Sequence, residues 1–354
     1  MLACKLIGFS LAEFHQPPLT MTRVEKLQRT GILRRGAKNR FRYVGADGSK
    51  VGKADLDRIE ALRIPPAWTE VAINKYPGGM LQAVGRDAAG RWQYIYHQAH
   101  VKKREQKKFQ RLLMFAESMP RLRKTVSRNL RKQGLDRERV MACILRILAT
   151  CFMRPGSQVY ASENGSYGIA TLRPKHIRVQ GDVVEFNFPG KRKILQKREL
   201  RDRPVARVLR ELLRHRGPQV FRYQNGDGEF VDIRRREINA YIKEVMGERF
   251  TSKDFRTWAG TLICACALAR AGAEADDSAA SRKRKVVKAV KETAEVLGNT
   301  PAVCRSAYIC PEVLIGFDQG RVIEHFDTVR DLVNHRGIRL NKSERALLRM
   351  LKRG

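Results

Sequence analysis

The stretch TSKDFRTWAGTLICACALARAG, residues 251 to 272, predicts one long helix. Thr and Ser at its start are candidate N-caps, and Gly272 is a suitable helix stop. Its body is apolar, whereas Lys253 and Arg256 lie three residues apart near the start and therefore on one helix face. The stretch combines a helix that can pack in a core with two cations that can meet an anion.

Two further helices are predicted on the C-terminal side of this stretch. The segment KVVKAVKETAEVLG, residues 285 to 298, has apolar residues at helical spacing and stops at Gly298. Thr300 is then expected to cap a new helix with Pro301 at its first position. Tyr308 is placed about two turns into that helix, among small and apolar neighbours.

On the N-terminal side, a helix and a strand region are predicted. RERVMACILRILATCF, residues 137 to 152, is long enough and apolar enough for a core helix. HIRVQGDVVEFNFPGKRKILQKREL, residues 176 to 200, instead indicates two or three short strands with turns at QGD and PGK.

The first third of the chain is typical of β structure. Short alternating runs broken by Gly, Asp and Pro extend from residue 40 to residue 98, and LQAVGRDAAGRWQYIYH, residues 81 to 97, predicts a hairpin. The basic run VKKREQKKFQR, residues 101 to 111, is helical and sits where a linker would be. We expect an α+β fold with an N-terminal extension at 1–20, a small β-rich domain and linker at 21–111, and a larger, mainly helical domain at 112–354.

The charge indicates a polyanionic partner. Lys and Arg number 71 and Asp and Glu 36, a formal net charge of +35, and such an excess favours nucleic acid. No apolar run approaches the roughly 20 residues that span a bilayer, and the N-terminus lacks a convincing signal peptide. The seven cysteines show no zinc spacing and indicate reduced thiols in a cytosolic protein.

The chemistry is narrowed by the motifs that the sequence lacks. There is no Walker loop, no dinucleotide fingerprint and no group of carboxylates that could hold two metal ions. A nucleic-acid enzyme without metal ligands must neutralise phosphate with side chains such as arginine, and it needs a nucleophile and a proton donor. Residues of these types occur in the order Arg154, Lys191, Lys253, Arg256, Asn299, Tyr308.

This order of residues resembles that of the type IB DNA topoisomerases, specifically their compact bacterial and poxvirus-like branch. The resemblance covers the chain from about residue 40 to its end. It is carried by five motifs together: RIPPAW, GRDAAGRWQYIYH, ENGSYGIATLRPKHI, KDFRTWAG and LGNTPAVCRSAY. The implied fold is a small β-rich domain and a larger helical catalytic domain that clamp duplex DNA.

The resemblance also implies roles for the ordered residues. Tyr308 would attack a backbone phosphate, form a 3′-phosphotyrosyl link and free a 5′-hydroxyl. The duplex would then rotate about the intact strand before the cut strand is religated. Arg154, Arg256 and Asn299 would hold the non-bridging oxygens, and Lys191 would protonate the leaving oxygen. Lys253 would be a secondary contact.

Further DNA contacts are implied for Gln93, Tyr94, Tyr96 and Tyr160, and the basic run favours phosphate contacts by Lys102 and Lys103. The family implies a monomer on double-stranded DNA that uses neither a metal nor a small-molecule cofactor, does not involve a membrane, and acts in the bacterial cytoplasm on the nucleoid.

Two alternatives remain open at this point. A tyrosine recombinase shares the nucleophile and both arginines, but usually carries His where this chain has Lys253, and it lacks the GRDAAGRWQY hairpin. A catalytically impaired DNA-binding protein is the other, because Pro155 follows the first arginine where the family usually has a different loop, and proline disfavours the helical region for the residue before it.

Overall fold

The computed structural model describes residues 22–36, 40–274 and 278–353 of the chain, so the extension expected at 1–20 lies outside the described residues. The chain divides into two compact units, Met1–Gln106 and Lys107–Gly354. Both helices and sheets are present, as an α+β fold requires, and each unit is described by itself.

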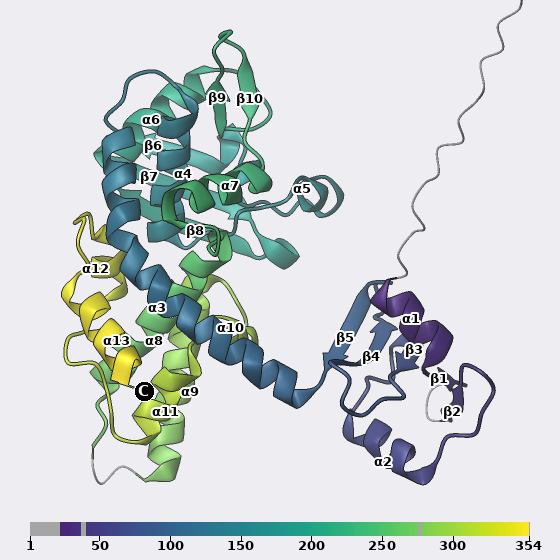
Figure 1. The fold of residues 1–354 in the computed structure, drawn as a ribbon. Coiled ribbons are helices and arrows are strands. Elements are labelled where there is room, and N and C mark those ends of the chain that lie inside the picture. Colours follow the sequence, from purple (N-terminus) through teal and green to yellow (C-terminus); the bar gives the residue numbers. More distant parts are fainter. Residues whose placement is uncertain (1–21, 37–39, 275–277, 354) are drawn as a thin grey trace, which may run out of the picture. The chain divides into compact units, whose positions relative to one another are not determined.

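The first unit is built on a five-stranded antiparallel sheet in the order β2-β1-β3-β4-β5 (Figure 1). One small core contains Leu27 of the first helix, and another contains Ile59 of the second. The predicted hairpin is confirmed as β4 and β5, whereas the second helix was not predicted. The elements are α1 (Arg23–Thr30), β1 (Ile32–Arg35), β2 (Arg42–Gly45), α2 (Lys53–Ala61), β3 (Thr69–Ile73), β4 (Leu81–Arg86) and β5 (Trp92–Tyr96).

The basic run is helical, as predicted, within α3 (Gln98–Asn129). The side chains of Lys102 and Lys103 lie outside the described residues. Further along α3, Phe115 packs edge-to-face against Phe255, with 5.1 Å between the ring centroids. This contact joins α3 to the helix predicted over residues 251 to 272.

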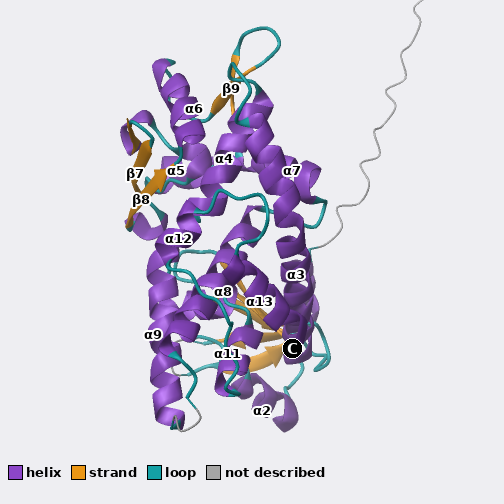
Figure 2. Cartoon of the chain, turned by 90° about the vertical axis from the view of Figure 1, so that its left-hand side faces the viewer, coloured by secondary structure: helices purple, strands orange, loops and turns teal. Residues whose placement is uncertain are grey.

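That helix, α8 (Ser252–Ala271), lies inside the second unit, with α3 and α9 on opposite sides of it (Figure 2). The other helices are α4 (Arg137–Cys151), α5 (Gln158–Asn164), α6 (Arg203–Arg214), α7 (Arg235–Met246), α9 (Ala279–Leu297), α10 (Pro301–Ala307), α11 (Pro311–Asp318), α12 (Val329–Asn334) and α13 (Lys342–Arg353). The predicted strands are confirmed as an antiparallel sheet in the order β6-β7-β8. The strands are β6 (Ile177–Gln180), β7 (Val183–Pro189), β8 (Leu195–Arg201), β9 (Arg222–Gln224) and β10 (Phe230–Asp232).

The predicted helix ends are confirmed in detail. Thr251 is the N-cap of α8, where the Asp254 carboxylate accepts from its backbone N–H at 2.8 Å and its hydroxyl at 3.0 Å, and Gly272 ends the helix. Gly298 ends α9 in the left-handed region at φ 61°. The prediction for the helix that begins at Pro301 needs one correction. Tyr308 is the residue that follows α10 and does not lie inside it.

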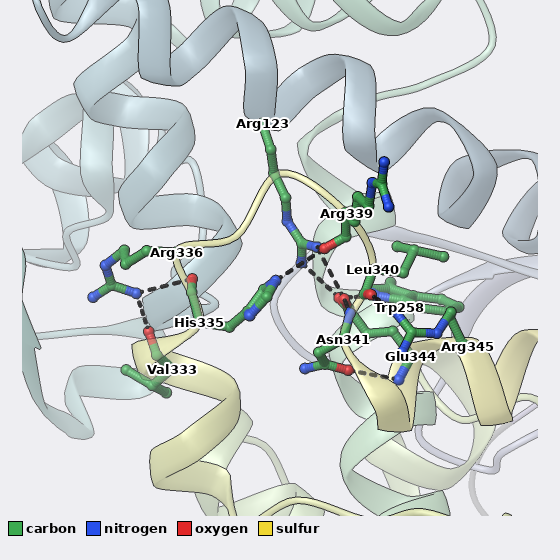
Figure 3. Close-up of polar contacts among 10 residues, drawn as sticks. All are labelled: Arg123, Trp258, Val333, His335, Arg336, Arg339, Leu340, Asn341, Glu344 and Arg345. Carbon is green, nitrogen blue, oxygen red and sulfur yellow. Dashed lines mark hydrogen bonds and ion pairs between the residues drawn. The ribbon is translucent and has the colours of Figure 1, made fainter.

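A buried carboxylate fastens the C-terminal helix to α3 and α8 (Figure 3). Glu344 is 3% exposed. It accepts two hydrogen bonds from Arg123 at 2.6 and 2.9 Å and one from the Trp258 indole at 3.5 Å. Asn341 and Glu344 each accept the other's backbone N–H. We call these four residues the C-terminal clasp.

Candidate active site

Tyr308 is held through its backbone by α8. The Thr261 hydroxyl donates to the Tyr308 carbonyl at 3.2 Å and accepts from the Cys310 N–H at 3.1 Å. The backbone of α8 comes close to Tyr308 at Gly260, where a Cβ would lie 2.8 Å from the Tyr308 carbonyl oxygen. The AGT step of α8 therefore fixes where the tyrosine emerges.

Arg256 projects from the same helix beneath the tyrosine. Its guanidinium carbon lies 5.0 Å from the centroid of the Tyr308 ring, and the residue is 3% exposed. It donates to the Leu297 carbonyl at 2.8 Å and to the Phe152 carbonyl. Burial lowers the pKa of Arg256, and the nearby Tyr308 opposes that shift. The charge is therefore kept out of water, next to the phenol.

Arg154 reaches the same place from the loop after α4. Its guanidinium donates to the Gly298 carbonyl at 2.9 Å and to Asn299 Oδ1. Burial first, and then the neighbouring Arg256, lower the pKa of Arg154 to about 10, so the group remains a cation at neutral pH.

The loop that contains Pro155 keeps Arg154 in this site. The Arg154 carbonyl accepts from the Ile169 N–H and the Pro155 carbonyl from the Ala170 N–H, both at 2.9 Å. Gly168 packs so closely that a Cβ there would lie 2.5 Å from the Gly156 nitrogen. The backbone after Arg154 is thus tied to a neighbouring segment, and the altered sequence does not remove the arginine from the site.

Asn299 is oriented by its arginine partner. A guanidinium has donors only, so the amide oxygen is the atom that faces Arg154. The amide nitrogen Nδ2 is buried and makes no hydrogen bond to the described protein. The Nδ2 group of Asn299 can therefore still donate a hydrogen bond, close to Arg154.

The two predicted lysines are exposed. Lys191 begins a short 3-10 turn, Lys191–Lys193, between β7 and β8, and Lys253 lies in the first turn of α8. Within the described residues, neither side chain forms a hydrogen bond or an ion pair. The structure thus brings Arg154, Arg256, Asn299 and Tyr308 together, and leaves both lysines at the surface.

Among the predicted DNA-contacting residues with described side chains, Tyr94 and Tyr160 are exposed, and Gln93 and Tyr96 are partly buried. In the first unit, Tyr94 is 44% exposed and stacks on Tyr96 with 6.3 Å between the ring centroids. Gln93 donates to Asp87 at 2.9 Å, an internal contact that orients its amide. In the second unit, Tyr160 on α5 is 56% exposed. The exposed rings of Tyr94 and Tyr160 are of a type that can stack on a base or contact a phosphate.

Arg198 and Gln196 were not among the residues predicted from the sequence. Both lie on β8 and line one small cavity with Arg154 and Arg256. None of the described residues that line this cavity is acidic. No motif singles out either residue, since each reaches the site only through the fold.

Other sites are not apparent within the described ranges. No group of three His, Cys, Asp or Glu side chains there is placed to hold a metal ion. Likewise, no helix in those ranges has the length and apolarity to cross a bilayer. The six cysteines among the described residues are buried, and none of them forms a disulfide there.

Two family descriptions match the sequence. "Eukaryotic DNA topoisomerase I, catalytic core" matches residues 97–310, a span that includes Arg154, Tyr308 and the predicted residues between them. "Bacterial DNA topoisomerase IB, N-terminal domain" matches residues 40–87. The two matches together cover parts of both units.

Curated relatives have the same kind of name. The chain is 34% identical over 291 residues to DNA topoisomerase 1B of Acanthamoeba polyphaga mimivirus. This match covers 80% of this chain and 87% of the relative. It is 26% identical over 261 residues to DNA topoisomerase 1B of Vaccinia virus (strain Copenhagen), covering 72% and 80%. It is 24% identical over 286 residues to DNA topoisomerase 1 of Rabbit fibroma virus (strain Kasza), covering 80% and 87%.

Proposed function

The chain belongs to the type IB DNA topoisomerases, and from that premise we propose that Tyr308 is the nucleophile with which it cuts and reseals one strand of duplex DNA. The family assignment makes the protein an isomerase that acts on DNA. It favours this function over both a tyrosine recombinase and a DNA-binding protein without activity. The roles of individual residues form the proposal.

The cleavage step exchanges one phosphodiester for another. The Tyr308 oxygen attacks the phosphorus atom, a P–O bond to tyrosine forms, and the bond to the 5′-oxygen breaks. The tyrosine proton passes to solvent, and the leaving 5′-oxygen takes a proton, which we assign to Lys191. Religation is the reverse reaction. Because the bond energy is retained in the phosphotyrosine, the cycle needs no ATP.

The convergence of four groups is the observation that carries the proposal. Arg256 lies under the Tyr308 ring, and Arg154 is bonded to Asn299. Two arginines and the Nδ2 donor of Asn299 can stabilise the charge that develops on the non-bridging oxygens. An amide donates at any pH in the working range, so Asn299 suits charge stabilisation and not proton transfer.

The exposed lysines fit roles that need DNA to be present. Lys191 sits at a hairpin turn, and we propose that it approaches the 5′-oxygen only when DNA is bound. Lys253, one turn before Arg256 on α8, would add a phosphate contact. Catalytic groups often reach their working geometry only in the substrate complex.

DNA binding extends the proposal to both units. Tyr94, Tyr96, Gln93 and Tyr160, with Lys102 and Lys103, would contact the duplex. The two units would close around it as a clamp, in a monomer acting on chromosomal DNA in the bacterial cytoplasm. The support is the net charge of +35, which attracts phosphate without regard to sequence.

The test is relaxation of supercoiled plasmid in EDTA without ATP, with the wild type beside Tyr308→Phe. We expect the wild type to relax the plasmid and to form a covalent adduct with labelled DNA, and the variant to do neither. A wild type that binds DNA but never forms the adduct would make the chain a DNA-binding relic. An adduct formed by Tyr308→Phe would assign the nucleophile elsewhere.

A further inference from the structure

The structure points to Arg198 as a positioning residue for the reaction, and this inference rests on the proposed function. We propose that Arg198, with Gln196, holds the last turn of α9, so that Arg154, Arg256 and Asn299 meet in the geometry that the phosphate requires. Arg198 acts through these residues and does not itself contact the phosphate.

The end of α9 supplies three successive carbonyl acceptors to three different arginines. Arg198 donates to the Val296 carbonyl at 2.9 Å, Arg256 to the Leu297 carbonyl at 2.8 Å, and Arg154 to the Gly298 carbonyl at 2.9 Å. The last carbonyls of a helix have no partner within the helix, and they carry the negative end of its dipole. The α9 terminus is thus a template on which the arginines are arranged.

Three hydrogen bonds tie the Arg198 guanidinium to the protein. Besides the Val296 carbonyl, it donates to Gln196 Oε1 at 3.0 Å and to the Lys197 carbonyl at 2.7 Å. No carboxylate within the described residues forms an ion pair with it. These contacts fix the position of the side chain and favour a positioning role over direct binding of DNA.

Gln196, which accepts a hydrogen bond from Arg198, packs between the turn that carries Lys191 and the end of α9. It is 7% exposed and fills the space beside two glycines. A Cβ at Gly190 would lie 2.7 Å from Gln196 Cγ, and a Cβ at Gly298 would lie 2.4 Å from Gln196 Oε1. Gly190 precedes Lys191 and Gly298 precedes Asn299, so one side chain packs against the backbone next to both the proposed proton donor and the proposed phosphate ligand.

Loss of Arg198 would release the first of the three carbonyls and the amide of Gln196. The Leu297 and Gly298 carbonyls could then shift, and Arg256, Arg154 and Asn299 with them. A displacement of about 1 Å in a reacting group can cost on the order of 100-fold in rate. We therefore expect a defect in the chemical step and not in DNA binding.

The first experiment compares Arg198→Met with the wild type in single-turnover cleavage of a duplex oligonucleotide, with the protein in excess and above its Kd. We expect cleavage to slow about 10- to 100-fold, with DNA affinity changed less than about twofold. Arg198→Lys keeps the charge but loses the planar guanidinium. Its cleavage rate should therefore lie between those of Arg198→Met and the wild type. The matched control is Arg201→Met, which removes the same charge from an exposed position on the same strand and should cleave like the wild type.

The second experiment tests whether Arg198 acts through Asn299. If it does, the defect of the double variant Arg198→Met/Asn299→Ala should be clearly smaller than the product of the two single defects, because one of the three positioned residues is already absent. Multiplied defects, or unchanged cleavage by Arg198→Met, would overturn the inference. A thermal melt checks folding, and Arg198→Lys replaces Arg198→Met in the cycle if the latter is unfolded.

The outcomes also separate this inference from the proposed function. If the wild type forms no adduct, the proposed function fails. If the wild type cleaves, Tyr308→Phe does not, and Arg198→Met matches the wild type, only the role of Arg198 is refuted.

Discussion

Two arginine clusters in the same unit are bonded in opposite ways. In the C-terminal clasp, Arg123 faces the buried carboxylate of Glu344 at 2.6 Å, and nearby Arg336 pairs with Asp202 at 2.8 Å. In the candidate active site, the protein acceptors of Arg154, Arg198 and Arg256 are carbonyl and amide oxygens. One cluster is neutralised by the protein, whereas the other keeps its charge.

The difference shows what each cluster is built to do. A carboxylate cancels a guanidinium charge and competes with any phosphate for it. A carbonyl fixes the geometry of the guanidinium but leaves a net charge that an incoming phosphate can bind. Burying that uncompensated charge costs stability in the free protein, and the bound DNA backbone would offset the cost.

The largest predicted effect is on stability, at the clasp. Arg123→Met should lower the free energy of unfolding by about 3–5 kcal/mol, because it leaves the Glu344 carboxylate buried and unpaired. Chemical denaturation measures the change. The cleavage rate per folded molecule should stay close to that of the wild type.

A second substitution checks the cause. In Arg123→Met/Glu344→Leu neither charge remains, and apolar replacement of a buried pair is often close to neutral. Most of the lost stability should therefore return. A double variant as unstable as the single one would mean that packing, and not the unpaired charge, accounts for the loss.

The next effect is on the rate, at the active site. Arg256→Met should slow cleavage by about 10² to 10³-fold, the usual cost of removing one donor to a developing oxyanion. Its unfolding free energy should fall by less than that of Arg123→Met, because no carboxylate is orphaned and removal of a buried charge offsets part of the loss of the donor to the Leu297 and Phe152 carbonyls. Single-turnover cleavage and denaturation on one preparation test both halves. A stability loss as large as that of Arg123→Met would erase the distinction between the clusters.

The helix ends near the active site could be predicted from sequence because their signals are local. Thr251, Gly272, Gly298 and the Thr300–Pro301 pair each fix a helix boundary through their own backbone or side chain. The strands and the hairpin followed from alternation and turn residues. The order β2-β1-β3-β4-β5 could not be predicted in this way, because it depends on contacts between residues far apart in the chain.

The candidate site divides along the same line. The ordered residues from Arg154 to Tyr308 could be named from the resemblance, because each lies in a short motif. Arg198 lies 98 residues before the carbonyl that it meets, and Arg123 lies 221 residues before Glu344. An arginine among many in a basic chain gives no sign of such a partner. The two clusters could therefore be told apart only once the fold was known.

A smaller effect is predicted at Gly298, where backbone and packing act together. An alanine there must adopt φ near 61° and place its Cβ 2.4 Å from Gln196 Oε1. Gly165→Ala is the matched control, since Gly165 also ends a helix at φ 58° but has open space around its Cβ position. The control should lose about 1–2 kcal/mol of unfolding free energy.

We expect Gly298→Ala to lose more stability than this control and, in addition, to slow cleavage, because Gln196 must move. Denaturation and single-turnover cleavage of both variants test the comparison. Equal stability and wild-type cleavage in both would show that the contact between Gln196 and Gly298 does not hold the α9 terminus in place.

The smallest effect separates the clusters by pH, because only the clasp depends on a carboxylate. Burial raises the pKa of Glu344, but its hydrogen bonds and charge interaction with Arg123 outweigh burial and hold the pKa below its ordinary value. A carboxyl group with a lowered pKa in the folded state stabilises the fold above its unfolded pKa of about 4.3, and this contribution is lost as the pH falls through the folded pKa. Denaturation of wild type and Glu344→Gln from pH 7 to pH 3 should therefore give a constant difference above about pH 5 and a shrinking one below it. A difference that does not change with pH would mean that the Glu344 charge adds nothing to the clasp, and the contrast with the carbonyl-bonded arginines would then rest on geometry alone.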